Sequence, residues 1–76
     1  MSIGKKLLSL RQEKGISQEA LGRELNVSRQ TVSKWESDLS LPDMKMMITI
    51  SQFYEISITQ LLDLDDETEA DSINKI

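Results

Sequence analysis

The chain has 76 residues, which is enough for one domain with a thin margin of stability that a partner subunit would improve. It contains neither cysteine nor histidine, so disulfides, thiolate or imidazole metal sites and the commonest general base are excluded. The longest uninterrupted apolar stretch has three residues, far short of a membrane span, and the first 20 residues hold no signal peptide. These features predict a cytoplasmic protein without a membrane segment or a cofactor.

The first half of the chain predicts three short helices. The first runs over residues 2–14, with apolar residues three and four positions apart, and it ends at Gly15, which adopts left-handed backbone angles cheaply. Ser17 can cap a second helix that ends before Asn26. Ser28 can cap a third helix in the same way.

The second half predicts a loop and two more helices. Residues 38–42 form the loop, Asp43 can cap the helix that follows, and a Ser-x-x-Gln capping box at residues 57–60 predicts a fifth helix ending at Leu62 or Leu64. From residue 65 onward the chain is polar and acidic. Residues 1–64 are therefore predicted to form the domain and residues 65–76 a flexible tail. No segment predicts a strand, so the expected fold is all-α.

Charge is distributed unevenly between the two halves. The overall formal charge is −4, but residues 1–36 carry a net charge of +3 and residues 37–76 a net charge of −7. Six acidic side chains fall between Asp63 and Asp71. A basic half of this kind is compatible with nucleic acid as a partner, although a merely solvated acidic end explains the asymmetry equally well.

Residues 17–36 predict a helix-turn-helix. Two helices of about eight residues flank a turn of three residues, and the small side chains of Ala20 and Gly22 let the helices approach closely. This geometry leaves the N-terminal half of the third helix projecting outward. A helix in that position fits the major groove of duplex DNA, which is about 12 Å wide.

The outward side chains of the third helix suit base recognition. Arg29 can pair with guanine and Gln30 with adenine, while Ser33 and Lys34 lie one turn further along the same face. Free backbone amides at the start of the second helix are expected to point at a phosphate. The backbone amides at the start of the fourth helix are further candidates for a phosphate contact. The residues expected at the DNA backbone are Ser17, Gln18, Ser28, Thr31 and Lys45.

A wider set of residues carries a family resemblance over about residues 3–64. The set is Arg11, Gly15-Ile16-Ser17-Gln18, Leu21, Leu25, Val27-Ser28, Val32-Ser33, Trp35-Glu36, Pro42, Ile50, Ile56-Ser57 and Leu61-Leu62. With these residues at these spacings the chain resembles the Cro/C1-type helix-turn-helix regulators, also called the xenobiotic response element family.

The resemblance implies a five-helix, lambda-repressor-like domain that binds a palindromic operator as a homodimer. It implies a structural ion pair between Arg11 and Glu36, and it places Gln18 at the phosphate backbone. It also implies base-reading positions at Arg29, Gln30 and Lys34. Repression of transcription by blocking polymerase is the expected activity, because no activation surface is legible.

Three residues depart from the family pattern. Asn26 and Asp38 stand where the family usually has glycine, and Glu55 replaces another frequent small residue. Asparagine and aspartate tolerate left-handed backbone angles better than most residues, so the fold is expected to persist. The loop at residues 37–43 carries no lysine or arginine. Fewer phosphate contacts are therefore expected from this loop than in relatives that use it to grip DNA.

Residues 44–54 predict a helix that is apolar around most of its circumference. Only Lys45, Thr49 and Gln52 form a polar strip, and a helix of this kind is buried on more than one side. A domain of this size cannot cover both sides itself, so we expect a second subunit to cover part of the helix. The expected dimer interface is drawn from Met46, Ile50, Phe53 and Ile58. The alternative is that the methionines fill an irregular core.

Two other functions fit the same sequence. The domain can serve as an antitoxin or other protein-interaction subunit, with the acidic tail or the fourth helix binding a partner protein. It can also be the N-terminal DNA-binding part of a longer regulator. An enzyme is not expected, because a carboxylate pair would have to supply the chemistry and the acidic residues cluster in the predicted tail.

Overall fold

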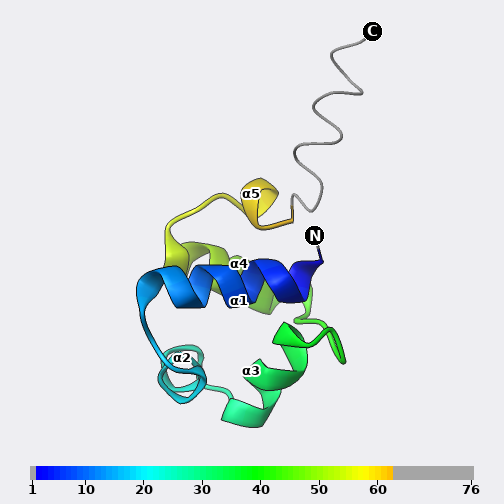
Figure 1. Cartoon of the computed structure of the whole chain (residues 1–76). Helices are drawn as coiled ribbons and strands as arrows, with labels where there is room; N and C mark the ends of the chain where they lie inside the picture. Colours follow the sequence, from blue (N-terminus) through cyan, green and yellow to red (C-terminus); the bar gives the residue numbers. More distant parts are fainter. Residues whose placement is uncertain (1, 63–76) are drawn as a thin grey trace, which may run out of the picture.

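The computed structural model describes residues 2–62, which form five α-helices and no strand. In chain order the helices are α1 (Ile3–Lys14), α2 (Gln18–Leu25), α3 (Arg29–Glu36), α4 (Met44–Tyr54) and α5 (Ile58–Leu62) (Figure 1). The predicted all-α class and the five predicted helices are confirmed. The predicted tail, residues 65–76, and the alternative helix end at Leu64 lie outside the described residues.

Local sequence signals explain where the helices begin. Four helices start after a side chain that accepts the backbone N–H three residues further on, and these caps are Ser2, Ser17, Ser28 and Asp43. The capping box that precedes α5 is reciprocal. Ser57 Oγ accepts the Gln60 N–H and Gln60 Oε1 accepts the Ser57 N–H, each at 2.9 Å. Each cap satisfies donors that a helix leaves unpaired at its first turn.

Left-handed residues end three of the helices and shape the loop after α3. Gly15 has φ 73°, and Asn26, Asp38 and Glu55 have φ between 59° and 64°. The expectation that Asn26 and Asp38 stand in for glycine is confirmed. Glu55 lacks the short side chain that makes this conformation tolerable, so it carries a cost of about 1 kcal/mol.

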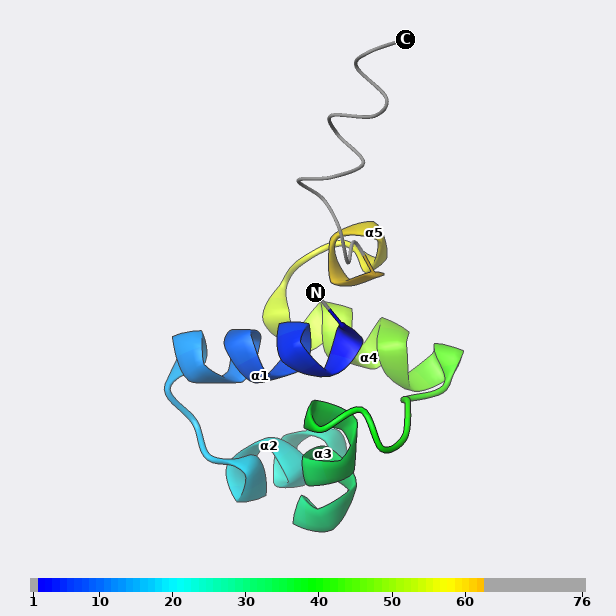
Figure 2. The same cartoon turned by 45° about the vertical axis from the view of Figure 1, so that its right-hand side comes forward.

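Helices α2 and α3 lie on one side of α1 and α5 lies on the other, with α4 beside α1 (Figures 1 and 2). The core that joins them consists of Leu7, Leu21, Leu25, Val32, Trp35, Met47, Ile50 and Leu61. Helix α3 packs against both α1 and α2, so its inward face, with Val32 and Trp35, is fixed by two neighbours. None of the helices within residues 2–62 is long and apolar enough to cross a membrane.

Two glycines permit close backbone contacts. A side chain at Gly22 would place its Cβ 2.6 Å from the carbonyl oxygen of Val27, so the predicted close approach within the helix-turn-helix is confirmed at Gly22. At Gly4, a Cβ would lie 2.6 Å from the carbonyl oxygen of Trp35. The N–H of Gly4 also donates to Asp38 Oδ1 at 3.0 Å, which ties the start of α1 to the loop after α3.

Helix α4 corrects one residue of the expected dimer interface. Ile50 is only 1% exposed because it lies on the face of α4 that enters the core, together with Met47 and Ser51. The prediction that Ile50 meets a second subunit is therefore wrong. Helical periodicity showed that α4 is apolar on several sides, but it did not show which side the rest of the domain covers.

Candidate nucleic-acid interface

The helix-turn-helix is held together from its inner side. The N–H of Val27 donates to the carbonyl of Gly22 at 2.8 Å, which closes the turn, and Leu21 and Leu25 are buried beneath it. Val32 is 0% exposed and Trp35 is 5% exposed, so α3 has one fully covered face. The opposite face of α3 is left for solvent or a ligand.

The structure places the four predicted base-reading residues on that opposite face. Arg29, Gln30 and Lys34 are exposed, and Ser33 is half-buried one turn after Arg29. Within residues 2–62, no carboxylate forms an ion pair with Arg29 or Lys34. Two cations and an amide therefore line one side of a short helix without an intramolecular charge partner.

The predicted backbone-contact residues cluster around the two N-termini of the motif. Ser17 Oγ accepts the Ala20 N–H at 3.0 Å, and Ser28 Oγ accepts the Thr31 N–H at 3.1 Å. The Ser28 and Thr31 hydroxyls also lie 3.0 Å apart. Lys45 lies apart from these residues, exposed in the first turn of α4.

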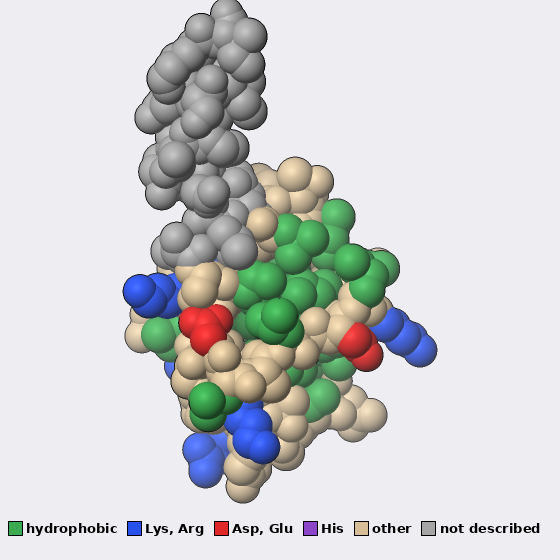
Figure 3. Space-filling view, turned by 90° about the vertical axis from the view of Figure 1, so that its right-hand side faces the viewer, with side chains coloured by type: hydrophobic (Ala, Val, Ile, Leu, Met, Phe, Trp, Pro, Cys, Tyr) green, Lys and Arg blue, Asp and Glu red, His purple; other side chains and the backbone are tan. Residues whose placement is uncertain are grey.

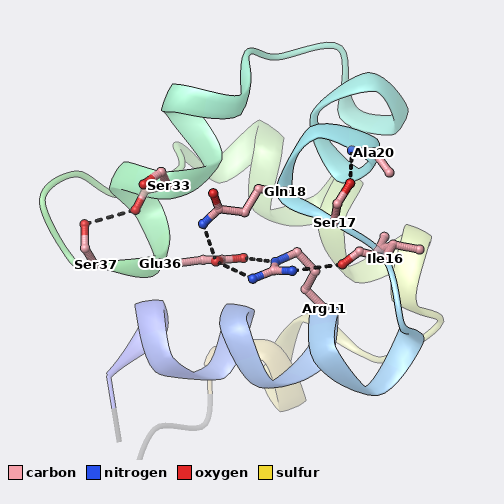
Figure 4. Close-up of polar contacts among 8 residues, drawn as sticks. All are labelled: Arg11, Ile16, Ser17, Gln18, Ala20, Ser33, Glu36 and Ser37. Carbon is pink, nitrogen blue, oxygen red and sulfur yellow. Dashed lines mark hydrogen bonds and ion pairs between the residues drawn. The ribbon is translucent and has the colours of Figure 1, made fainter.

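Arg11 and Glu36 form a bidentate pair between α1 and α3. Arg11 Nε lies 2.7 Å from Glu36 Oε2, and Arg11 Nη2 donates to Oε1 at 3.1 Å (Figure 4). The side chains are 15% and 5% exposed. Hydrogen bonding to the Glu36 carboxylate, which accepts from the guanidinium, raises the pKa of Arg11 above its ordinary value, against the opposing effect of burial. The pair is therefore a charged contact in a largely buried position.

Two further hydrogen bonds extend the pair into a network. Arg11 Nη1 donates to the carbonyl of Ile16 at 2.8 Å, and Gln18 Nε2 donates to Glu36 Oε1 at 3.0 Å (Figure 4). Glu36 therefore connects α1 with the first residue of α2, and Arg11 connects α1 with the loop that follows it. An amide nitrogen carries two hydrogens, so Gln18 keeps one donor beyond the bond to Glu36.

Sequence reasoning missed the contacts of Gln18 with Glu36 and of Gly4 with Asp38. Each joins residues far apart in sequence, 18 and 34 positions respectively, and no local pattern encodes such a contact. It also missed the most exposed large apolar side chains, which are Leu39, Leu41, Met44 and Ile48. The available signals were the two leucines within residues 37–43 and the apolar sequence of residues 44–54.

Comparison with known proteins identifies the motif. A helix-turn-helix family model matches residues 7–61. The chain belongs to this family. The predicted resemblance to the Cro/C1-type regulators is confirmed, and the chain carries the DNA-binding domain of a transcriptional regulator.

Two curated relatives are longer than this chain. It is 42% identical over 62 residues to the HTH-type transcriptional activator BcrR of Enterococcus faecalis, which covers 82% of this chain and 30% of that protein. It is 33% identical over 78 residues to the HTH-type transcriptional regulator ImmR of Bacillus subtilis (strain 168), and this match covers 99% of this chain and 61% of that protein. The chain thus spans less than two thirds of the length of either relative.

Two solved structures share the fold. One is the P22 c2 repressor protein in complex with synthetic operator 9T, at a TM-score of 0.76 and 27% identity, over 82% of this chain and 94% of that one. The other is a transcriptional regulator from Listeria innocua, at a TM-score of 0.76 and 24% identity, over 99% of this chain and 78% of that one. The lambda-repressor-like arrangement of five helices is thereby confirmed.

Proposed function

We propose that this chain binds a palindromic operator as a homodimer, with α3 in the major groove, and represses transcription. The observation that carries the proposal is the two-sided character of α3. Val32 and Trp35 fix one face in the core, while Arg29, Gln30 and Lys34 stand exposed on the other. The structural similarity to a repressor in complex with an operator supports the same reading.

Base reading is assigned to Arg29, Gln30, Ser33 and Lys34. The Arg29 guanidinium can donate two hydrogen bonds to the O6 and N7 atoms of guanine, and the Gln30 amide can pair with N6 and N7 of adenine. Each good bidentate pair discriminates against a wrong base by about 1–3 kcal/mol. The exposed positions of both side chains at the start of α3 support this assignment.

Phosphate contacts are assigned to the capping residues and to Lys45. The Ser17 hydroxyl accepts a backbone N–H, which leaves its own hydrogen free to donate to a phosphate. Gln18 retains a second amide hydrogen beyond its bond to Glu36, so it can bridge Glu36 and a phosphate. Ser28 and Thr31 offer hydroxyls at the start of α3, and Lys45 offers a cation at the start of α4.

The test begins with selection of bound sequences from random duplexes, followed by titration of the selected operator and a scrambled duplex. Arg29→Ala should lose about 1–3 kcal/mol on the operator and much less on the scrambled duplex. Arg23→Ala is the matched control, because it removes the same charge from an exposed position on α2. Gln18→Ala should weaken both duplexes by a similar factor, since phosphate contacts carry no sequence information.

Salt dependence gives a second readout. The logarithm of the binding constant falls by about 0.9 per neutralised phosphate for each tenfold rise in salt. The loop at residues 37–43 holds no cation, so we expect a shallow slope for a protein of this family. If Arg29→Ala and Gln30→Ala leave the preference for the operator unchanged, α3 does not read the bases and the proposal fails.

Activation is a second candidate, favoured by one specific observation. The relative that is 42% identical to this chain is a transcriptional activator. That relative is also much longer, so residues outside the matched domain can supply its activating contacts. A promoter fusion carrying the selected operator separates the two functions: repression lowers expression when the chain is present, and activation raises it.

A further inference from the structure

An apolar surface remains uncovered at the start of α4. Leu41 and Met44 are each 61% exposed, and Ile48 is 45% exposed. Met44 and Ile48 are four residues apart on α4, so they share one face of the helix, and Leu41 precedes them in the loop. We call these three residues the α4 patch. Figure 3 shows apolar side chains gathered on this side of the molecule, with acidic and basic side chains at the margins.

The α4 patch lies on a different edge of the helix from the interface predicted by sequence. Met46, Phe53 and Ile58 are half-buried and pack against the core of their own chain. Phe53 also contacts the Tyr54 ring edge-on, with ring centroids 5.0 Å apart, and the Lys14 ammonium lies 5.2 Å from its centroid. Phe53 is therefore engaged within the monomer, whereas Ile48 and Met44 are not covered.

The charges beside the α4 patch are self-complementary. Asp43 and Lys45 are both exposed and lie on either side of Met44 in the sequence. Asp43 uses Oδ1 to cap α4, which leaves Oδ2 available for another contact. In an isologous contact, if Asp43 of one copy meets Lys45 of the other, then Lys45 of the first copy meets Asp43 of the second. An acid and a base at the margin can therefore pair twice across the two-fold axis. Margins of a single sign would repel a second copy.

The position of the patch suits two copies on one duplex. The loop after α3 and the first turn of α4 form the right-hand side of the molecule in Figures 1 and 2, while α2 and α3 lie at its lower end. A two-fold axis that runs vertically beside this face leaves both copies of α3 at the same lower end. Two reading helices on one side of a dimer match the symmetry of a palindromic site.

We propose that the α4 patch is the surface through which a second copy of this chain binds, in place of the edge formed by Met46 and Phe53. The inference rests on the proposed homodimer and specifies its interface. Three side chains bury less surface area than the roughly 800 Å² that each partner contributes to a standard interface. The dimer is therefore weak in free solution and is reinforced when both copies bind adjacent half-sites.

Sedimentation equilibrium at micromolar to submillimolar concentration tests this surface without DNA. Ile48→Glu should weaken self-association at least tenfold, because it places a charge within an apolar contact. Thr49→Glu is the matched control, since it adds the same charge at the next, exposed position and should change association less than twofold. Leu41→Ser lies outside any helix and should weaken association as Ile48→Glu does.

Titration of a full operator and of a single half-site completes the test. The Ile48→Glu and Leu41→Ser variants should bind the half-site as the unmodified chain does, but lose the cooperative gain on the full operator. Association unchanged by both variants would overturn the α4 patch, as would association lost in Phe53→Glu and retained in Ile48→Glu. A dimer of the unmodified chain that fails to bind any selected DNA would instead refute the proposed function and leave the surface standing.

Discussion

Replacing Arg11 with alanine removes the cation that holds α1 to the end of α3. The substitution deletes both hydrogen bonds to the Glu36 carboxylate and the bond to the carbonyl of Ile16. Glu36 remains in a position where its side chain is 5% exposed. Gln18 Nε2 is then the one donor left to it among the contacts of the network.

The size of the effect follows from the burial of the residue that is left behind. Removing one partner of a buried ion pair costs about 3–5 kcal/mol when the remaining charge has no access to water. The Arg11 side chain is 15% exposed, so its truncation opens a path for water to Glu36, and Gln18 stays bonded. We therefore expect a loss of about 2–3 kcal/mol of unfolding free energy. In a domain of this size that loss lowers Tm by about 10–20 °C.

Thermal and urea unfolding followed by circular dichroism measure this loss. Arg23→Ala is the control, because Arg23 pairs with Glu19 at 3.8 Å while both side chains are more than 70% exposed. Such a surface pair contributes well under about 1 kcal/mol. A double-mutant cycle with Glu36→Ala isolates the coupling between Arg11 and Glu36. A melting temperature for Arg11→Ala that equals that of Arg23→Ala would refute a structural role for the pair.

Three further substitutions test other features of the fold. Glu55→Gly should raise the unfolding free energy by about 0.5–1 kcal/mol, measured by urea unfolding, because φ at Glu55 is 59° and glycine adopts that angle without strain. Gly4→Ala should lower it by about 1–3 kcal/mol, since the new Cβ would lie 2.6 Å from the Trp35 carbonyl oxygen; an unchanged Tm would contradict the close contact. Tyr54→Phe should cost nothing at neutral pH, because the Tyr54 hydroxyl is buried without a hydrogen-bond partner in the part of the chain that the structure describes. Burial raises the pKa of Tyr54 to about 12 from an ordinary value of 10.0, so the phenol ionises in the unfolded chain before it ionises in the folded one. Its contribution to stability is therefore independent of pH below about 10, and the protein loses stability as the pH rises from there through about 12. The phenol should titrate near that pH by ultraviolet absorbance, and Tyr54→Phe should abolish this part of the alkaline loss.

The features that sequence predicted are those set by neighbouring residues. Ser17, Ser28 and Asp43 cap helices because their side chains reach a backbone N–H three residues away, whatever the rest of the fold does. The alternation of buried and exposed positions on α3 likewise follows from helical periodicity. The outward face with Arg29, Gln30 and Lys34 is therefore predictable from the order of the residues alone.

The features that sequence did not predict depend on how the helices pack. Ile50 and Ile48 both lie on an apolar helix, and only the placement of the other helices decides that Ile50 is buried and Ile48 exposed. The bond between Gly4 and Asp38 spans 34 positions and requires the loop after α3 to fold back onto α1. Periodicity contains no information about either choice, which is why the dimer edge was misassigned at Ile50.

The network at Glu36 also bears on how readily the reading helix is available to DNA. Helix α3 has eight residues, and a helix of that length is marginal in water when it stands alone. Its last residue is clamped by Arg11 and Gln18, and its inner face is packed against α1 and α2. The helix is therefore preorganised, and binding need not spend free energy on ordering it. If the clamp were loosened, the apparent affinity for every DNA sequence would fall in proportion to the fraction of molecules that keep α3 in place, with the choice between sequences unaffected.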